Sequence, residues 1–266
     1  MSARKAVTSR AVYLRSESNV TRSNRAAVGR DATRWRAVIW VLLSVLLLGA
    51  VMVGLGWLVT HSFAHAWPFT AEDGVDRGLA AHRDPVLTTV TGVLSTVADT
   101  PVTVLLAVAA IIVARLVTRR WRASALIASA LLIEVSLFLI TTVLVHRSRP
   151  GVIELDHSPP TSSFPSGHTA AAMALYGAVA WLIARGTGRW QAWLLLLMPA
   201  AVAFARLYRG MHHPSDVVAG FLLGACSLAI AVHAVYAQRP LSGRAHLSPA
   251  RGPRYRSRSA ISEGRR

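Results

Sequence analysis

Six long apolar runs constrain the fold of this 266-residue chain more than any other feature of its sequence. The chain is 53% hydrophobic and 15% charged, and its apolar residues do not follow the short periodic stripes of soluble helices and strands. Because a helix needs about 20 apolar residues to cross a bilayer core, the sequence predicts an all-α fold, a bundle of six transmembrane helices. The runs comprise residues 38–59, 101–117, 123–145, 169–184, 192–205 and 217–237.

The net charge of +17 is concentrated outside these runs. A nucleic-acid-binding protein would carry a basic stripe interleaved with aromatic residues in a soluble segment, and the sequence has none, so we predict no nucleic-acid partner. Arginines beside membrane spans instead suit contacts with anionic membrane lipids. The sequence predicts a basic, disordered N-terminal tail (1–36), a membrane domain (37–237) and a basic, disordered C-terminal tail (238–266).

The distribution of arginine also predicts the orientation of the bundle. Arginines are frequent in both tails, between the second and third runs and between the fourth and fifth, which are alternating connections. By the positive-inside rule, both termini are cytoplasmic. The other connections, which contain residues 61–100, 149–168 and 206–216, then lie at the outer face of the cytoplasmic membrane. The first run is too long for the apolar core of a signal peptide, so we expect a retained anchor.

The first outward connection contains a predicted amphipathic helix. The segment Thr70-Ala71-Glu72-Asp73 resembles a helix start. Downstream apolar residues recur at helical spacing opposite threonines and a serine, namely Val86, Leu87, Val90, Val93, Leu94 and Val97. We expect this helix either to lie on the membrane face or to pack against the bundle.

Ionisable side chains cluster in the other two outward connections, and such groups mark functional sites near a membrane. Pro214 suits the first position of a helix, so we expect the sixth span to begin there, with Asp216 in its first turn. A carboxylate at that position can reach back to His212, fix the tautomer of its imidazole and stabilise its cationic form. His212 is therefore a candidate nucleophile.

A second group of residues opens the fourth span. Ser166 is a good N-cap, and Gly167 lets a ligand approach the backbone. The free N–H groups of a helix start bind anions, and His168 at the rim is suited to protonate a leaving oxygen. The arginines that could hold phosphate oxygens are Arg149 and Arg206, with Arg147 and Arg209 in reserve. Together these residues are expected to support phosphoryl transfer.

In this order and spacing, the residues resemble the type 2 phosphatidic acid phosphatase superfamily, also called lipid phosphate phosphatases. The family pattern runs Lys-x6-Arg-Pro, Pro-Ser-Gly-His and Ser-Arg-x5-His-x3-Asp. The residues that match it are Arg149-Pro150, Pro165-Ser166-Gly167-His168, Arg206, His212 and Asp216. The resemblance covers the six-helix core and implies hydrolysis of a lipid phosphate through a phosphohistidine.

The resemblance also implies a role for each matching residue. His212 is the nucleophile with Asp216 as its partner, and His168 is the acid for the leaving group and then the base for water. The residues that hold the phosphate are Arg149, Arg206, Ser166 and Gly167. The family uses no metal, and we expect no cofactor. The single cysteine and the lack of a carboxylate cluster among the motifs agree with this expectation.

Two positions depart from the family pattern. Thr142 stands where the family has lysine, and Ala205 stands where it has serine. The missing lysine removes a positive charge from the phosphate site, and Arg147 is the nearest substitute. A third oddity is Glu134 inside the third span, which is either the partner of an arginine or histidine or a buried carboxyl at a helix interface.

We therefore expect an integral-membrane, metal-independent phosphatase that acts on a lipid phosphate or diphosphate of the polyprenyl diphosphate, phosphatidate or phosphatidylglycerol phosphate class. Two alternatives keep the same site: a phosphotransferase using the same histidine, and a catalytically weak or silent relative that binds lipid phosphates. An anion channel or transporter would need polar residues through the depth of its spans, whereas these spans are nearly pure Leu, Val and Ala. The oligomeric state is not predicted.

Overall fold

The computed structural model describes residues 35–63, 66–157 and 161–237, and all regular structure in this part of the chain is helical. Six of its helices are long and apolar enough to cross a membrane, which confirms the predicted all-α bundle. These spans are Trp35–Ser62, Thr100–Thr118, Trp121–Leu144, Gly167–Thr187, Trp190–Tyr208 and Pro214–Tyr236. The predicted disordered tails lie outside the described residues, apart from Trp35 and Arg36.

The centre of the bundle is formed by α5 (Trp121–Leu144), α6 (Gly167–Thr187) and α8 (Pro214–Val232), which pack against one another. Glycines let α8 approach α6 closely. A Cβ atom added at Gly220 would lie 2.4 Å from the carbonyl oxygen of Ser166, and one added at Gly224 would lie 2.4 Å from that of Ala170. Small residues spaced by four have this effect in membrane helices. The contact fixes the start of α6 against α8.

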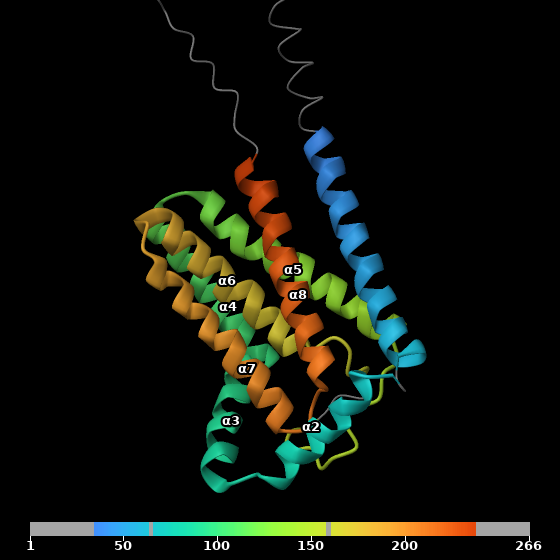
Figure 1. Cartoon of the computed structure of the whole chain (residues 1–266). Helices are drawn as coiled ribbons and strands as arrows, with labels where there is room; N and C mark the ends of the chain where they lie inside the picture. Colours follow the sequence, from blue (N-terminus) through green and yellow to red (C-terminus); the bar gives the residue numbers. More distant parts are fainter. Residues whose placement is uncertain (1–34, 64–65, 158–160, 238–266) are drawn as a thin grey trace, which may run out of the picture.

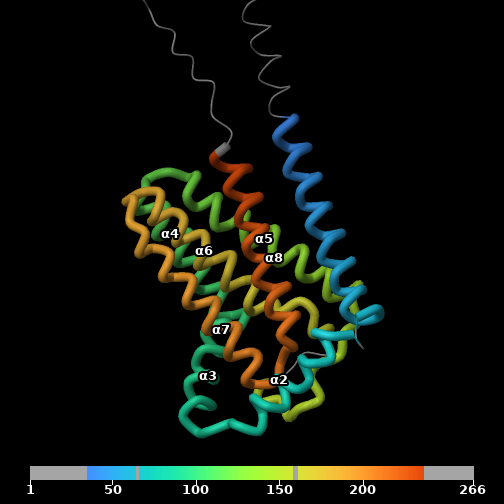
Figure 2. The backbone as a smooth tube through the Cα atoms, viewed as in Figure 1, coloured from blue at the N-terminus to red at the C-terminus, as the bar shows by residue number. Residues whose placement is uncertain are grey.

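The remaining spans surround this centre (Figures 1 and 2). Helix α4 (Thr100–Thr118) packs on α5, and α7 (Leu197–Tyr208), preceded by a 3-10 segment, packs on α6. The first span contributes Leu48 and Met52 to a buried cluster with side chains of α5 and α8, and most of its surface is exposed. Such an exposed apolar surface suits contact with lipid.

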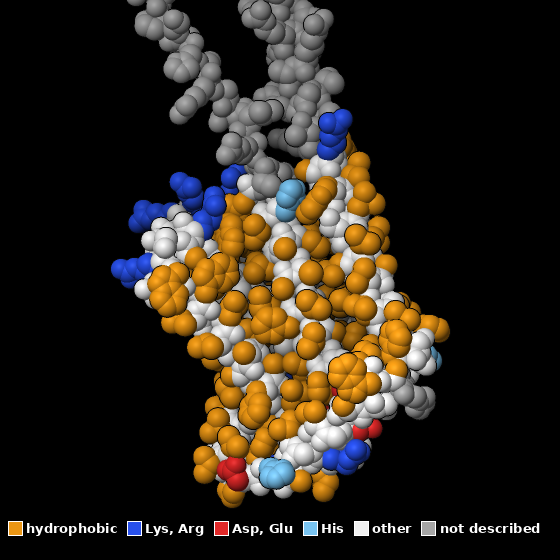
Figure 3. Space-filling model, in the orientation of Figure 1, with side chains coloured by type: hydrophobic (Ala, Val, Ile, Leu, Met, Phe, Trp, Pro, Cys, Tyr) orange, Lys and Arg blue, Asp and Glu red, His pale blue; other side chains and the backbone are white. Residues whose placement is uncertain are grey.

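The two ends of the bundle differ in charge. The first span begins and α8 ends at one end, whereas α2 (Phe69–Ala81) and α3 (Pro85–Ala98) lie at the other (Figure 1). Figure 3 shows arginine side chains gathered toward the first of these ends, a broad hydrophobic band, and mixed charges near α2 and α3. The arrangement agrees with the predicted alternation of basic connections. The side of the membrane that each end faces stays a prediction from the charge pattern.

The first connection folds into two helices. Helix α2 begins at Phe69, next to the predicted start, and Asp84 caps α3 by accepting hydrogen bonds from the backbone N–H groups of Val86 and Leu87, both at 2.9 Å. The face of α3 that packs on the protein carries Thr91, Ser95 and Ala98, whereas Val86, Val90 and Val93 on its apolar face are exposed. The apolar face is therefore not the one that packs against the bundle, and it is free to contact a membrane.

Candidate active site

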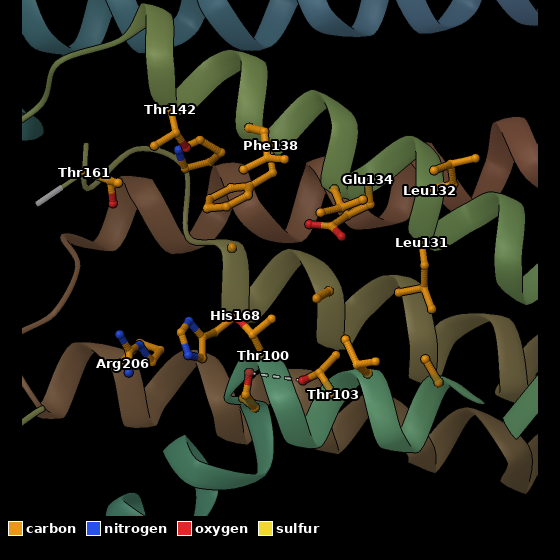
Figure 4. Close-up of a pocket in the computed structure, with 18 of the residues that line it drawn as sticks. Thr100, Thr103, Leu131, Leu132, Glu134, Phe138, Thr142, Thr161, His168 and Arg206 are labelled. Carbon is orange, nitrogen blue, oxygen red and sulfur yellow. Dashed lines mark hydrogen bonds between the residues drawn. The ribbon is translucent and has the colours of Figure 1, made fainter. Parts of the chain in front are cut away.

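The three outward motifs meet at one end of a cavity of about 560 Å³. Its polar end is formed by Arg149, His168, Arg206 and His212, which come from three separate segments of the chain. The remaining wall is mostly apolar and is built by α4 and α5. Figure 4 shows His168 and Arg206 at one end of this cavity and Leu131 and Leu132 toward the other. The predicted convergence of the two histidines and the two arginines is thus present in the fold.

The imidazole of His212 is held in one orientation by the backbone. Its Nδ1 lies 2.8 Å from the carbonyl oxygen of Ser163, and because a carbonyl can only accept, Nδ1 carries the proton. The other ring nitrogen, Nε2, is then unprotonated. Burial, together with the positive charges of Arg206 and Arg149, lowers the pKa of His212 well below its usual value. His212 is therefore neutral at physiological pH and keeps a lone pair for nucleophilic attack.

Asp216 lies in the first turn of α8, as expected from Pro214 at its start. Its carboxylate oxygen is 3.9 Å from His212 Nδ1, too far for the expected hydrogen bond, and Ser163 takes that place. Asp216 is fully buried, accepts a hydrogen bond from the backbone N–H of His213 at 2.9 Å and pairs with Arg147. Its negative charge is close enough to stabilise a cationic His212, and its contacts hold the loop that carries this histidine.

Arg147 does not line the cavity. One terminal nitrogen contacts Asp216 and lies 2.7 Å from Ser215 Oγ, and the other lies 2.8 Å from Glu72. These contacts use the guanidinium group to bridge two buried carboxylates. The placement argues against the prediction that Arg147 binds phosphate or replaces the family lysine, and it gives Arg147 a structural role. Thr142, which stands in the place of that lysine, does line the cavity.

The start of α6 has the predicted order of residues, but Ser166 and Gly167 differ in exposure. Gly167 borders the cavity, and a Cβ atom added there would lie 2.7 Å from the ring of Phe138. Ser166 is fully buried, and its hydroxyl lies 3.1 Å from the hydroxyl of Thr169. The expected phosphate contact of the Ser166 side chain is therefore not available in this arrangement. Its backbone N–H donates to the carbonyl of Asp216 at 2.9 Å and ties α6 to α8.

His168 extends from the first turn of α6 into the cavity, and its Nε2 lies 3.2 Å from Asp99. Asp99 directly precedes α4 and is about half exposed. A carboxylate in this position accepts a hydrogen bond from Nε2 and holds the imidazole in place. Asp99 is not identifiable from the sequence, because a single aspartate in the first connection carries no motif and is brought to His168 only by the packing of α4 on α6.

The guanidinium groups of the two cavity arginines are each held in place by hydrogen bonds to other groups of the protein. Arg149 donates to the carbonyl of Met211 at 2.6 Å, and Arg206 donates to Ser95 at 2.7 Å and to Asp156 at 3.0 Å. The Nε of Arg206 is buried and has no hydrogen-bond partner among the described residues. Anchored guanidinium groups with free donors are suited to hold phosphate oxygens without losing side-chain entropy on binding.

Arg209, the second reserve arginine, forms its hydrogen bonds with other groups of the protein and does not line the cavity. It donates to Asp156 at 2.8 Å and to the backbone carbonyls of Thr88 and Leu155. Burial raises the pKa of Asp156, but the hydrogen bonds from Arg209 and Ser95 and the charges of Arg209 and Arg206 more than offset this and lower it below its usual value. Asp156 therefore stays ionised and holds both arginines against α3. No sequence motif indicates this role.

Two buried acidic side chains of helix α2, those of Glu72 and Asp76, form hydrogen bonds with the loop before α8. Glu72 accepts hydrogen bonds from the backbone N–H and the hydroxyl of Ser215, at 2.8 and 3.0 Å. It also accepts the hydrogen bond from Arg147. Asp76 accepts one from Nδ1 of His213 at 2.8 Å. Together with Asp73, the Asp76 and His213 ligand atoms lie within 4.8 Å of one another, but the hydrogen bond between the two buried residues already accounts for their proximity.

The pair of His213 and Asp76 predicts a pH-dependent stability. Burial lowers the pKa of His213, but the hydrogen bond to Asp76 more than offsets this, and the net shift is upward from 6.5. A raised pKa in the folded state stabilises the protein fully below about pH 6.5, and this stabilisation is lost as the pH rises through the folded value. We expect Asp76→Asn to lower the thermal midpoint most below pH 6.5 and less at pH 9. A difference that is constant or grows with pH would contradict this assignment.

Comparisons with known proteins point to one superfamily. The pattern of the PAP2 superfamily matches residues 121–240, the segment that contains α5 to α8 and all the matching motif residues. The chain is 38% identical over 78 residues to the bacitracin transport permease protein BcrC of Bacillus licheniformis, which covers 29% of this chain and 36% of that protein. It is 41% identical over 71 residues to an undecaprenyl-diphosphatase of Sulfolobus acidocaldarius, which covers 26% of this chain and 32% of that protein.

The aligned segments thus span about a third of the length of these curated relatives. A crystal structure of a transmembrane PAP2-type phosphatidylglycerolphosphate phosphatase from Bacillus subtilis matches with a TM-score of 0.59 and 20% identity, over 73% of this chain and 92% of that chain. At that identity the match shows a shared fold. With the matched pattern lying on the helices that build the cavity, residues 121–240 of this multi-pass membrane protein are those of a PAP2 superfamily member.

Proposed function

We propose that this protein hydrolyses a lipid phosphate or diphosphate through a phosphohistidine intermediate. The observation that carries the proposal is the shape of the cavity, which joins a polar end with two arginines and two histidines to an apolar channel between α4 and α5. A phosphate group suits the polar end, and a hydrocarbon chain suits the apolar wall. A soluble phosphate ester would leave most of that wall in contact with water, at a cost that grows with its apolar area.

The arrangement suits two successive displacements at phosphorus. In the first, Nε2 of His212 attacks the phosphorus, the P–N bond forms, and the bond to the leaving oxygen breaks as His168 gives that oxygen a proton. Arg149, Arg206 and the backbone N–H groups at the start of α6 neutralise the charge on the phosphoryl oxygens. In the second, His168 takes a proton from water, the water oxygen attacks phosphorus, and inorganic phosphate leaves His212. No step requires a metal ion.

The names of similar proteins support a lipid substrate but do not choose one. One relative is an undecaprenyl-diphosphatase, and a protein of similar fold is a phosphatidylglycerolphosphate phosphatase. For this chain, polyprenyl diphosphate, phosphatidate and phosphatidylglycerol phosphate are all compatible with a phosphate group on a long apolar chain. The predicted orientation places the reaction at the outer face of the cytoplasmic membrane.

A phosphate-release assay tests the proposal. Protein purified in detergent is expected to release phosphate from at least one of these three lipids, and release is expected to continue in EDTA because the proposed nucleophile and charge stabilisers are side chains. Activity that disappears in EDTA and returns with a divalent metal would contradict the histidine mechanism. Transfer of phosphate to an added alcohol, with none to water, would indicate the phosphotransferase instead.

A further inference from the structure

One carboxyl group interrupts the apolar wall of the cavity. Glu134, on α5, lines the cavity, and only 3% of its surface is exposed. It forms no hydrogen bond or ion pair with any residue that the structure describes. Figure 4 shows its carboxyl group directed into the cavity, between the polar end and the residues Leu131 and Leu132. A buried carboxyl without a partner costs free energy, so its presence in this wall calls for a ligand that pairs with it.

Glu134 is too deep in the cavity to contact the phosphate. It precedes Thr142, which lies near the polar end, by eight residues, or about 12 Å along a helix. Side chains on a helix lean toward its N-terminus, and the N-terminal end of α5 is the one farther from the polar end of the cavity. The lean therefore carries the Glu134 carboxyl away from the phosphate. The group that pairs with Glu134 therefore belongs to the lipid part of the substrate.

The opposite wall does not supply this partner. The hydroxyl of Thr103, on α4, also lines the cavity and already donates to the carbonyl of Ala98 at 3.1 Å. On the side of Glu134, the hydroxyl of Thr142 is buried and likewise has no partner in the described part of the chain. Two polar side chains of α5 thus face the cavity with unused hydrogen-bonding atoms, one near the phosphate end and one deeper.

We propose that Glu134 is a specificity-determining residue whose protonated carboxyl donates a hydrogen bond to an ester, amide or hydroxyl oxygen in the lipid part of the substrate. This inference rests on the proposed function and narrows it. A glycerolipid phosphate carries two ester groups beyond its phosphate, whereas a polyprenyl chain is an unbroken hydrocarbon. A polyprenyl chain would bury the carboxyl of Glu134 without a partner, so the site favours lipid phosphates with a polar group over polyprenyl phosphates. A hydrogen-bonding site rejects ligands that lack the matching group more strongly than an apolar site rejects ligands that carry an extra one.

The test compares lipids that differ in this group. The probes are dioleoyl phosphatidate, its dialkyl ether analogue, which lacks the ester carbonyls, and a polyprenyl monophosphate, each presented in mixed detergent micelles. The parent is expected to show the highest kcat/KM with the ester lipid. Glu134→Leu, which removes the hydrogen-bonding atoms, is expected to lower the ester-to-polyprenyl ratio of kcat/KM about tenfold, the effect of one buried hydrogen bond. Glu134→Gln keeps hydrogen-bonding atoms of similar size and is expected to retain the preference.

Stability serves as an independent check on folding. Because the carboxyl has no protein partner, Glu134→Leu is expected to keep or raise the thermal midpoint. A ratio unchanged in Glu134→Leu, or an equal loss on all three lipids, would overturn the inference while leaving the proposed phosphatase intact. A parent that releases phosphate from none of these lipids, nor from polyprenyl diphosphate, would instead overturn the proposed function and this inference with it.

Discussion

Replacing His212 with asparagine is expected to lower the rate of phosphate release by a factor on the order of 10⁴ or more, because the covalent route loses its nucleophile. Asparagine can still donate a hydrogen bond to the carbonyl of Ser163, which accepts the Nδ1 proton in the native protein. The loop should therefore remain folded, and the thermal midpoint should change little. Release of phosphate from the preferred lipid, measured at saturating substrate, gives the effect on kcat.

His157 and His168 provide matched comparisons for this variant. His157 is exposed in the connection before α6, so His157→Asn is expected to keep the parent rate. His168→Asn keeps the nucleophile but loses the group that protonates the leaving oxygen and later activates water. With a phosphorus-labelled polyprenyl diphosphate, whose leaving phosphate depends little on that proton, formation of the phosphoenzyme is slowed less than its hydrolysis, so reaction is expected to leave an acid-labile label on the protein. Peptide mapping should place this label on His212. A label on any other residue, or a His212→Asn variant with parent activity, would refute the mechanism.

The elements that carry the chemistry were predictable from the sequence because their signals are local. Pro214 at the start of α8 and Gly167 at the start of α6 are helix-start signals, and the structure has both helices beginning there. The six spans were predictable for the same reason, since each is a continuous apolar segment. The alternation of spans predicted that Arg149, His168, Arg206 and His212 share one face of the bundle and can converge, and the structure brings them to one cavity.

The residues that support this site were not predictable, because their contacts join distant parts of the chain. Glu72 occurs in a segment that reads only as a helix start, yet it binds Ser215, 143 residues away. Asp156 has no motif, and its role appears only when α3 and α7 bring Ser95 and Arg206 beside it. The hydrogen bond of His212 is made by a backbone carbonyl, that of Ser163, whose side-chain identity gives no signal. The proximity of Arg147 to Arg149 in the sequence suggests a phosphate contact, but it does not show that the Arg147 side chain points toward Glu72 and Asp216.

The bridging position of Arg147 predicts a large effect on stability. Arg147→Met keeps an unbranched apolar stem of similar shape but leaves Glu72 and Asp216 buried without a counter-charge. Removing one partner of a buried ion pair costs about 3–5 kcal/mol, which corresponds to a fall in the thermal midpoint of about 10 °C for a domain of this size. Activity should fall with it, because Asp216 and Ser215 shape the loop that presents His212. The measurements are thermal unfolding in detergent and kcat at a temperature where the variant remains folded.

This result separates a structural Arg147 from a phosphate-binding one. If Arg147 bound the substrate phosphate, Arg147→Met would raise KM and leave the thermal midpoint of the free protein unchanged. Arg77, exposed on α2, is the matched control, and Arg77→Met is expected to leave both the midpoint and KM near the parent values.

The bridge also predicts coupling between its members. Glu72→Gln should cost less stability in the Arg147→Met background than in the parent, because it then removes a buried charge that has already lost its counter-charge. Additive effects of the two substitutions would show that the bridge does not hold α2 to the loop that presents His212.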